Sequence, residues 1–122
     1  MILVDTSVWI EHFRLGNNGL TKLLDNTQVL MHPFVIGELA CGNLNQRRKI
    51  LNGLNWLPQA NMASDSEVLY FIESQKLMGQ GIGYIDTHLL ASVTLTHAAG
   101  IWTRDKRLEM VAFDMNLGWQ PG

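Results

Sequence analysis

Short apolar runs alternate with longer stretches of helical spacing along this chain. Residues 2–4 are wholly apolar and partly β-branched, which is typical of a strand buried on both faces of a parallel sheet. Further strands are expected at residues 29–31, 56–57 and 101–103, the one at 56–57 being weak. Residues 113–117 would add a fifth strand at an edge of the sheet.

Helical segments are expected between these strands. Thr6 or Ser7 is expected to cap the first helix, which ends in a cluster of glycine and asparagine at residues 16–19. The other helices are expected over residues 20–24, 33–41, 46–54, from 64 to a glycine-rich loop at 79–83, from 84 to about 100, and over 106–111. This alternation predicts an α/β fold: one domain over residues 1–122, with a central parallel sheet of four to five strands and helices on both faces.

Composition narrows the classes of function. With 122 residues, 47% of them hydrophobic, the chain is large enough to bury one core without disulfides. Nine basic and eleven acidic residues give a net charge of −2, so a broad basic surface for nucleic acid is not expected. The single cysteine, Cys41, has no partner for a disulfide or a thiolate zinc site. No apolar run has the length of a signal peptide or a membrane span, and a cytoplasmic location is expected.

Four acidic residues are the candidate functional groups. Asp5 directly follows the first strand, and Asp105 lies two residues beyond the strand that ends at Thr103. Because ligands of α/β folds bind at the carboxyl ends of parallel strands, both acids are expected at one crevice. Asp86 lies in the first turn of its helix, close to the buried face. Glu38 interrupts the apolar stripe of the helix expected over residues 33–41.

Each of these acids also has a simpler structural explanation. Asp86 would complement the dipole of its helix, and Asp105 would cap the helix that follows it. Glu38 would pack its methylene groups on the core and keep its carboxylate in water. Asp5 is harder to explain in this way, because a carboxylate that ends a buried strand needs a partner. No basic residue is expected in the interior to pair with four converging carboxylates. A hard divalent cation, Mg²⁺ or Mn²⁺, is the better partner, and such ions usually serve phosphate chemistry.

The acids stand in motifs that resemble a known family. The motifs are Val4-Asp5-Thr6-Ser7, Glu38 in the helix after the second strand, Ile85-Asp86-Thr87-His88-Leu89-Leu90-Ala91 and Thr103-Arg104-Asp105. Their order, and the intervals of 33, 48 and 19 residues between the acids, resemble the PIN-domain ribonucleases. Within that superfamily, the size of the chain is most similar to the VapC-type toxins of bacterial toxin–antitoxin pairs.

The resemblance implies a function and a site. The chain is expected to be a metal-dependent endoribonuclease toxin that hydrolyses RNA phosphodiester bonds, with one or two ions of Mg²⁺ or Mn²⁺. It is also expected to form a homodimer and to be inhibited by a small cognate VapB-like antitoxin whose tail covers the active site. The acidic quartet implied for metal and catalysis is Asp5, Glu38, Asp86 and Asp105, with Thr6, Ser7 and Thr103 as supporting polar residues.

Charge and the remaining motifs leave some alternatives open. The quartet contributes −4 of the net −2, so the other residues sum to +2, and the candidate contacts for RNA phosphates are Arg104, Lys106 and Arg107. Gly79, Gly81 and Gly83 follow a helix and not a strand, so they indicate a flexible connection and not a phosphate loop. The alternative to a nuclease is a catalytically silent PIN module that binds RNA or a protein partner and has a structural metal site.

Overall fold

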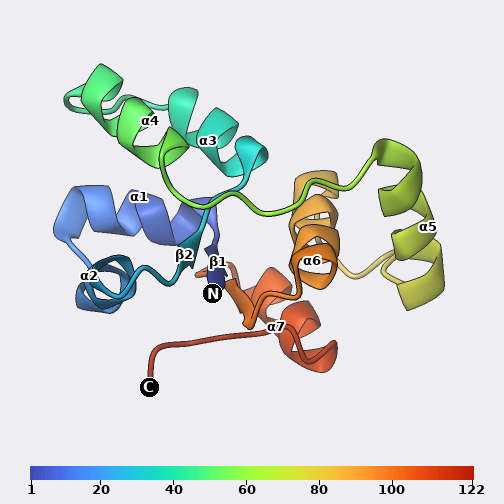
Figure 1. The fold of residues 1–122 in the computed structure, drawn as a ribbon. Coiled ribbons are helices and arrows are strands. Elements are labelled where there is room, and N and C mark those ends of the chain that lie inside the picture. Colours follow the sequence, from blue (N-terminus) through green and yellow to red (C-terminus); the bar gives the residue numbers. More distant parts are fainter.

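A computed structural model describes residues 1–122 and contains three strands and seven helices (Figure 1). The strands are β1 (Ile2–Val4), β2 (Val29–Leu30) and β3 (Gly100–Trp102). The helices are α1 (Thr6–Leu15), α2 (Asn18–Asp25), α3 (Pro33–Ala40), α4 (Arg47–Asn55), α5 (Asp65–Gln75), α6 (Tyr84–Thr96) and α7 (Lys106–Asp114). All seven expected helices are therefore present, and their bounds lie within a few residues of the prediction.

The sheet is parallel and has the strand order β2-β1-β3. Leu3 of β1 pairs with Leu30 on one side and with Ile101 on the other. Helices α1 to α4 gather on the β2 side and α5 to α7 on the β3 side (Figure 1). Because the three strands run in one direction, their carboxyl ends meet at one edge, where α1, α3 and α7 begin.

The expected strand at residues 56–57 is wrong. Helix α4 continues to Asn55, and Trp56 closes it with a side chain that is 88% exposed. Gln59 then forms one isolated parallel bridge with Met31. The backbone N–H of Asn61 turns away and donates to the hydroxyl of Thr96 at 2.8 Å, so the pairing does not extend into a strand.

The expected edge strand at residues 113–117 is also wrong, which leaves three strands in place of four to five. Helix α7 runs on to Asp114, and the chain then reverses at Asn116, whose φ is +59°. Beyond this turn, only Gly118 bridges to β3, at Ile101. Apolar spacing is ambiguous in so short a segment, and continuation of the helix is the outcome.

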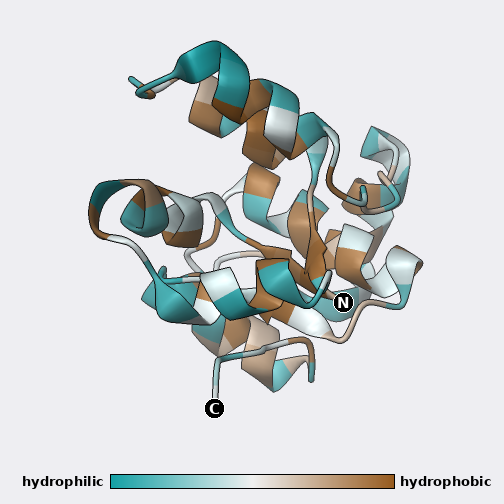
Figure 2. Cartoon of the chain, turned by 60° about the vertical axis from the view of Figure 1, so that its left-hand side comes forward, coloured by the Kyte–Doolittle hydropathy of each residue, from teal (hydrophilic) through white to brown (hydrophobic).

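The core is one cluster of 21 buried apolar residues that unites the three strands with the inner faces of the helices. Leu3 and Val4 at the centre of the sheet are fully buried. Figure 2 shows the apolar residues concentrated toward the interior, with polar residues on the outer helix faces. None of the seven helices is both long enough and apolar enough to cross a bilayer. The core thus fixes the ends of β1 and β3, which Asp5 and Asp105 follow, and the helices α3 and α6, which carry Glu38 and Asp86.

Candidate functional site

Asp5 is the most enclosed of the four acids, with 7% of its surface exposed. It follows β1, and its carboxylate caps α1 by accepting from the backbone N–H of Ser7; neither Thr6 nor Ser7 is the cap. The hydroxyls of Ser7 and Thr103 donate to the same oxygen, Oδ2, at 2.7 and 2.8 Å. These bonds fix the carboxylate through Oδ2 and leave Oδ1 without a hydrogen bond from the protein.

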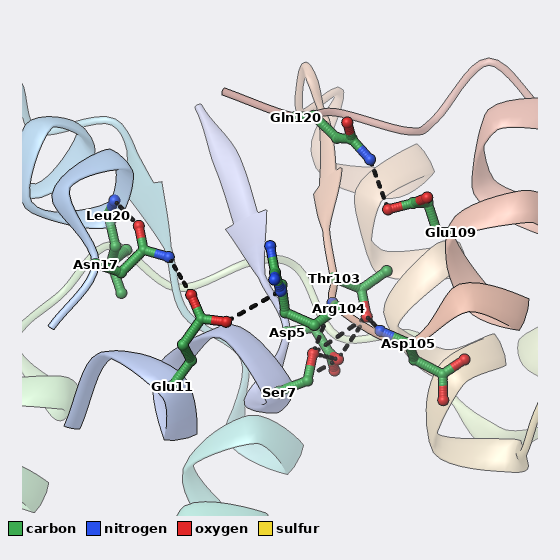
Figure 3. Close-up of polar contacts among 10 residues, drawn as sticks. All are labelled: Asp5, Ser7, Glu11, Asn17, Leu20, Thr103, Arg104, Asp105, Glu109 and Gln120. Atoms are coloured by element: carbon green, nitrogen blue, oxygen red, sulfur yellow. Dashed lines mark hydrogen bonds and ion pairs between the residues drawn. The ribbon is translucent and has the colours of Figure 1, made fainter. Parts of the chain in front are cut away.

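Thr103 joins the ends of β1 and β3 around this carboxylate (Figure 3). Its hydroxyl accepts from the backbone N–H of Asp105 at 3.0 Å, and the Ser7 hydroxyl accepts from the N–H of Arg104 at 2.9 Å. Each hydroxyl carries a single proton, which it gives to Asp5, so the 3.3 Å separation between the two hydroxyl oxygens is a contact and not a donated bond. The network therefore fixes the position of Asp5 relative to Asp105.

Glu38 reaches the site from α3, and its side chain is exposed at the rim. The hydroxyl of Thr6 donates to its Oε1 at 2.8 Å, which links α3 to the first residue of α1. The neighbouring stripe residues Val35 and Leu39 are buried in the core. Glu38 thus has an anchored stem and a carboxylate that is oriented through one oxygen.

Asp86 and Asp105 each hold the N-terminus of a helix. Asp86 accepts from the backbone N–H of Gly83 at 3.0 Å, in the first turn of α6. Asp105 is the N-cap of α7 and accepts from the N–H of Leu108 at 3.0 Å. The structural roles considered for these two acids are therefore real. Each role occupies one carboxylate oxygen and leaves the other without a hydrogen bond.

Asp86 lies close enough to the other three carboxylates for their charges to act on it. Burial raises the pKa of Asp86, and the Gly83 hydrogen bond opposes this rise. The negative charges of Asp5, Asp105 and Glu38 raise the pKa of Asp86 further. All four expected acids therefore belong to one electrostatic cluster at the carboxyl edge of the sheet.

The chemistry of this cluster fits a divalent cation. The two ion pairs of the structure involve Asp65 and Glu11, so no basic side chain neutralises any of the four acids. As placed, no three His, Cys, Asp or Glu side chains are close enough together to enclose a metal ion directly. This arrangement suits Mg²⁺, which retains several waters and uses one or two carboxylates directly.

The three candidate RNA-contacting residues differ in their surroundings. Arg104 forms an ion pair with Glu11, whose Oε2 lies 3.1 Å from its Nε, and Glu11 in turn accepts from Asn17 at 2.7 Å (Figure 3). Lys106 is exposed and makes no side-chain hydrogen bond or ion pair. Arg107 packs against the backbone of Gly81. The guanidinium of Arg104 is thus engaged within the protein, whereas the ammonium of Lys106 and the guanidinium of Arg107 have no hydrogen-bonding or charged partner.

Comparison with known proteins identifies the family. The profile of the PIN domain matches residues 2–114. The chain belongs to the PIN domain family. This PIN domain is 47% identical over 109 residues to Ribonuclease VapC32 of Mycobacterium tuberculosis, covering 89% of the chain and 88% of that protein. The resemblance to VapC-type PIN domains is therefore confirmed.

More distant relatives cover the chain almost completely. Ribonuclease VapC11 of Mycobacterium tuberculosis is 25% identical over 128 residues, which span 96% of each protein. A chain in the crystal structure of FitAcB from Neisseria gonorrhoeae superposes with a TM-score of 0.66 at 23% identity, covering 99% of this PIN domain and 98% of that chain. At this identity the superposition establishes the shared α/β fold.

One cluster beside the site was missed in the sequence. His88 is 1% exposed, and its Nε2 lies 3.3 Å from Oδ1 of Asp65, which also accepts from the hydroxyl of Tyr84 at 2.9 Å. The rings of Phe34 and Tyr84 pack edge-on against the imidazole, with ring centroids 4.8 and 4.7 Å from that of His88. Partial burial raises the pKa of Tyr84, and Asp65 adds to the effect. The cluster ties the start of α5 to the turn of α6 that carries Asp86.

Proposed function

We propose that this PIN domain is an endoribonuclease that acts as the toxin of a type II toxin–antitoxin pair. It would hydrolyse RNA phosphodiester bonds with a divalent cation, Mg²⁺ or Mn²⁺. The proposal is supported by the geometry that joins Asp5 to the Asp105 segment through the hydroxyl of Thr103, and by the raised pKa of Asp86, to which burial and the charges of Asp5, Asp105 and Glu38 contribute. The identity of 47% to a protein named as a ribonuclease supports the same activity.

The four acids would hold the cation through their free oxygens, one or two of them directly and the others through bound water. The free oxygens are Oδ1 of Asp5, Oε2 of Glu38, Oδ1 of Asp86 and Oδ2 of Asp105. When bound, the cation supplies Lewis-acid polarisation of the phosphate and lowers the pKa of nearby water. An oxygen-only set of ligands does not choose between Mg²⁺ and Mn²⁺.

The polar neighbours orient the carboxylates. Thr103 and Ser7 hold Asp5 in position, and Thr6 orients Glu38. Asp86 has a raised pKa, so, if it holds the cation only indirectly, it is the acid best suited to accept, at Oδ1, the proton that the attacking water loses. The site would thus combine three carboxylates that supply charge with one that moves a proton.

The expected partners remain proposals that follow from the family. A homodimer and a VapB-like antitoxin would each need exposed apolar surface to bind. The structure has such surface in a groove of about 420 Å³ between α5 and α6, which includes Tyr70 and Leu95. Trp56, 88% exposed at the end of α4, is a second such feature.

The decisive test of the proposed function is RNA cleavage by the purified protein without antitoxin. Defined RNAs are incubated with the protein in EDTA, Mg²⁺ or Mn²⁺, beside the variants Asp5→Asn and Asp86→Asn. We expect metal-dependent cleavage that both variants lose by at least about 100-fold, because each removes a ligand charge. Asp25→Asn, which alters an exposed carboxylate on α2, is the matched control and should cleave normally.

Two results would contradict the proposal. Cleavage that persists in both ligand variants would show that another site, or a contaminant, cuts the RNA. RNA binding by the wild-type protein without any metal-dependent cleavage would instead support the silent PIN module.

A further inference from the structure

Arg107 rests on the backbone of Gly81 in a space that only glycine leaves open. Gly81 has a φ of +82° and lies in the loop between α5 and α6. A Cβ at this position would lie 2.7 Å from Cδ and 3.1 Å from Cζ of Arg107, with Nη1 nearer still. Any larger residue at position 81 would therefore displace the guanidinium. The glycines of this loop are thus not explained by flexibility alone.

The contact lies between the two segments that supply Asp86 and Asp105. Gly81 precedes by two residues Gly83, whose N–H donates to Asp86. Arg107 follows Asp105 by two residues and lies in the first turn of α7. The arginine side chain consequently extends from the segment that carries Asp105 to the loop that precedes Asp86.

The charge of Arg107 is not used within the protein. Its guanidinium makes no hydrogen bond and no ion pair, whereas that of Arg104 is paired with Glu11 at 3.1 Å. A guanidinium has five donors in a planar fork that matches two phosphate oxygens. An exposed guanidinium without a partner, packed against the loop that precedes Asp86, is available to an anion that comes with the substrate.

We infer that Arg107, held against Gly81, binds a phosphate of the RNA next to the carboxylate cluster. Gly81 is a positioning residue that acts only through Arg107. The inference rests on the proposed function, since it takes RNA as the substrate. It also distinguishes Arg107 from Arg104, whose guanidinium is held by α1.

The first test measures binding of a fluorescent single-stranded RNA by anisotropy in EDTA over a series of salt concentrations. Arg107→Ala should raise the Kd by about tenfold or more. It should also reduce the slope of log K against log salt by about 0.7, the value for one phosphate contact on a single strand. Arg107→Lys should recover the slope and part of the affinity. Arg48→Ala, which removes an exposed charge on α4, is the matched control and should bind as the wild type does.

The second test separates positioning from backbone strain. Gly81→Ala and Gly79→Ala both place alanine at a positive φ, +82° and +72°, but nothing lies within 4 Å of a Cβ at position 79. Both variants should lower the Tm to a similar extent, and only Gly81→Ala should weaken RNA binding. In the Arg107→Ala background, Gly81→Ala should cause no further loss of affinity.

The outcomes are distinguishable from failure of the proposed function. If the wild type binds and cleaves RNA and Arg107→Ala leaves the Kd and the salt slope unchanged, only the present inference is overturned. If Gly81→Ala binds normally, or weakens binding equally with and without Arg107, the positioning role is wrong. If the wild type neither binds nor cleaves RNA, the proposed function fails and this inference fails with it.

Discussion

His32 is a fully buried histidine that joins two elements of the candidate site. It caps α3, the helix of Glu38, by accepting at Nδ1 from the backbone N–H of Phe34 at 3.0 Å. Its proton must therefore lie on Nε2, which is 3.0 Å from the hydroxyl of Ser92 on α6, the helix of Asp86. Protonation at Nδ1 would remove the capping bond, so this histidine is built to be neutral.

The pH dependence of stability follows from this burial. Burial, with a smaller contribution from the charge of His88, lowers the pKa of His32 from 6.5 to about 4. The unfolded chain therefore binds a proton near pH 6.5 and the folded protein only near pH 4. The contribution of His32 to the free energy of unfolding should be constant well above pH 6.5, fall between pH 6.5 and 4, and level off below. The full shift in the pKa of His32 corresponds to about 3 kcal/mol in the free energy of unfolding, of which about 2 kcal/mol is lost by pH 5.

The assay is urea unfolding of the wild type and His32→Asn at pH 7.5 and pH 5.0. Asparagine keeps an acceptor for the cap but cannot take up a proton. We expect the wild type to lose about 2 kcal/mol more than the variant between the two values of pH. Groups that titrate in both proteins cancel in this comparison.

A second variant separates burial from the hydrogen bond. Ser92→Ala should destabilise the protein by about 1–3 kcal/mol at pH 7.5, because it leaves the Nε2–H of His32 without an acceptor. It should keep most of the pH difference, since burial is the main cause of the lowered pKa. Equal pH differences in the wild type and His32→Asn would refute the reasoning.

Three predictions concern the acidic cluster. Thr103→Val, which removes a donor to Asp5, should weaken Mg²⁺ binding by about 10–100-fold in a calorimetric titration; an unchanged affinity would argue against its orienting role. Negative neighbours raise the pKa of Asp86, so Glu38→Gln should lower the pKa of the Asp86 carboxyl, followed by NMR in metal-free protein. A rise in the pKa of Asp86 would contradict the cluster. Asp105→Asn should keep the cap of α7 and lose metal affinity, whereas Asp105→Ala should also lose about 1 kcal/mol in urea unfolding. Similar stabilities of these two variants would show that the cap contributes little.

Helical periodicity was the more informative signal for the fold. The longer helices could be predicted because apolar positions recur at a spacing of three or four along them, and the short ones because capping residues, glycine and proline mark their ends. The two failed strands cover only two and five residues, too few for periodicity to distinguish a strand from the end of a helix. At Trp56 and again at Asp114, a helix simply continues, and the sheet gains one bridge in place of a strand.

The acids could be predicted because topology places them, whereas several of their partners could not. Asp5 and Asp105 follow strands, and parallel strands end at a common edge, so their proximity needs no knowledge of side-chain packing. Asp65 and Glu11 lie on helix surfaces, and no local pattern shows that they meet His88 and Arg104. Such contacts depend on how helices pack, which spacing along one helix does not determine.

Capping and metal binding are not competing explanations for the acids. Asp5 and Asp105 cap α1 and α7, and Asp86 occupies the first turn of α6, so three helix N-termini face one cluster. Each N-terminus carries a partial positive charge of about half a unit, which reduces the repulsion among the carboxylates before any cation binds. Because each cap uses one oxygen of its carboxylate, the same geometry that stabilises the helices leaves a second oxygen for the ion. The capping bonds thus orient the ligands, so an acid with an ordinary structural role is a stronger candidate for the site, not a weaker one.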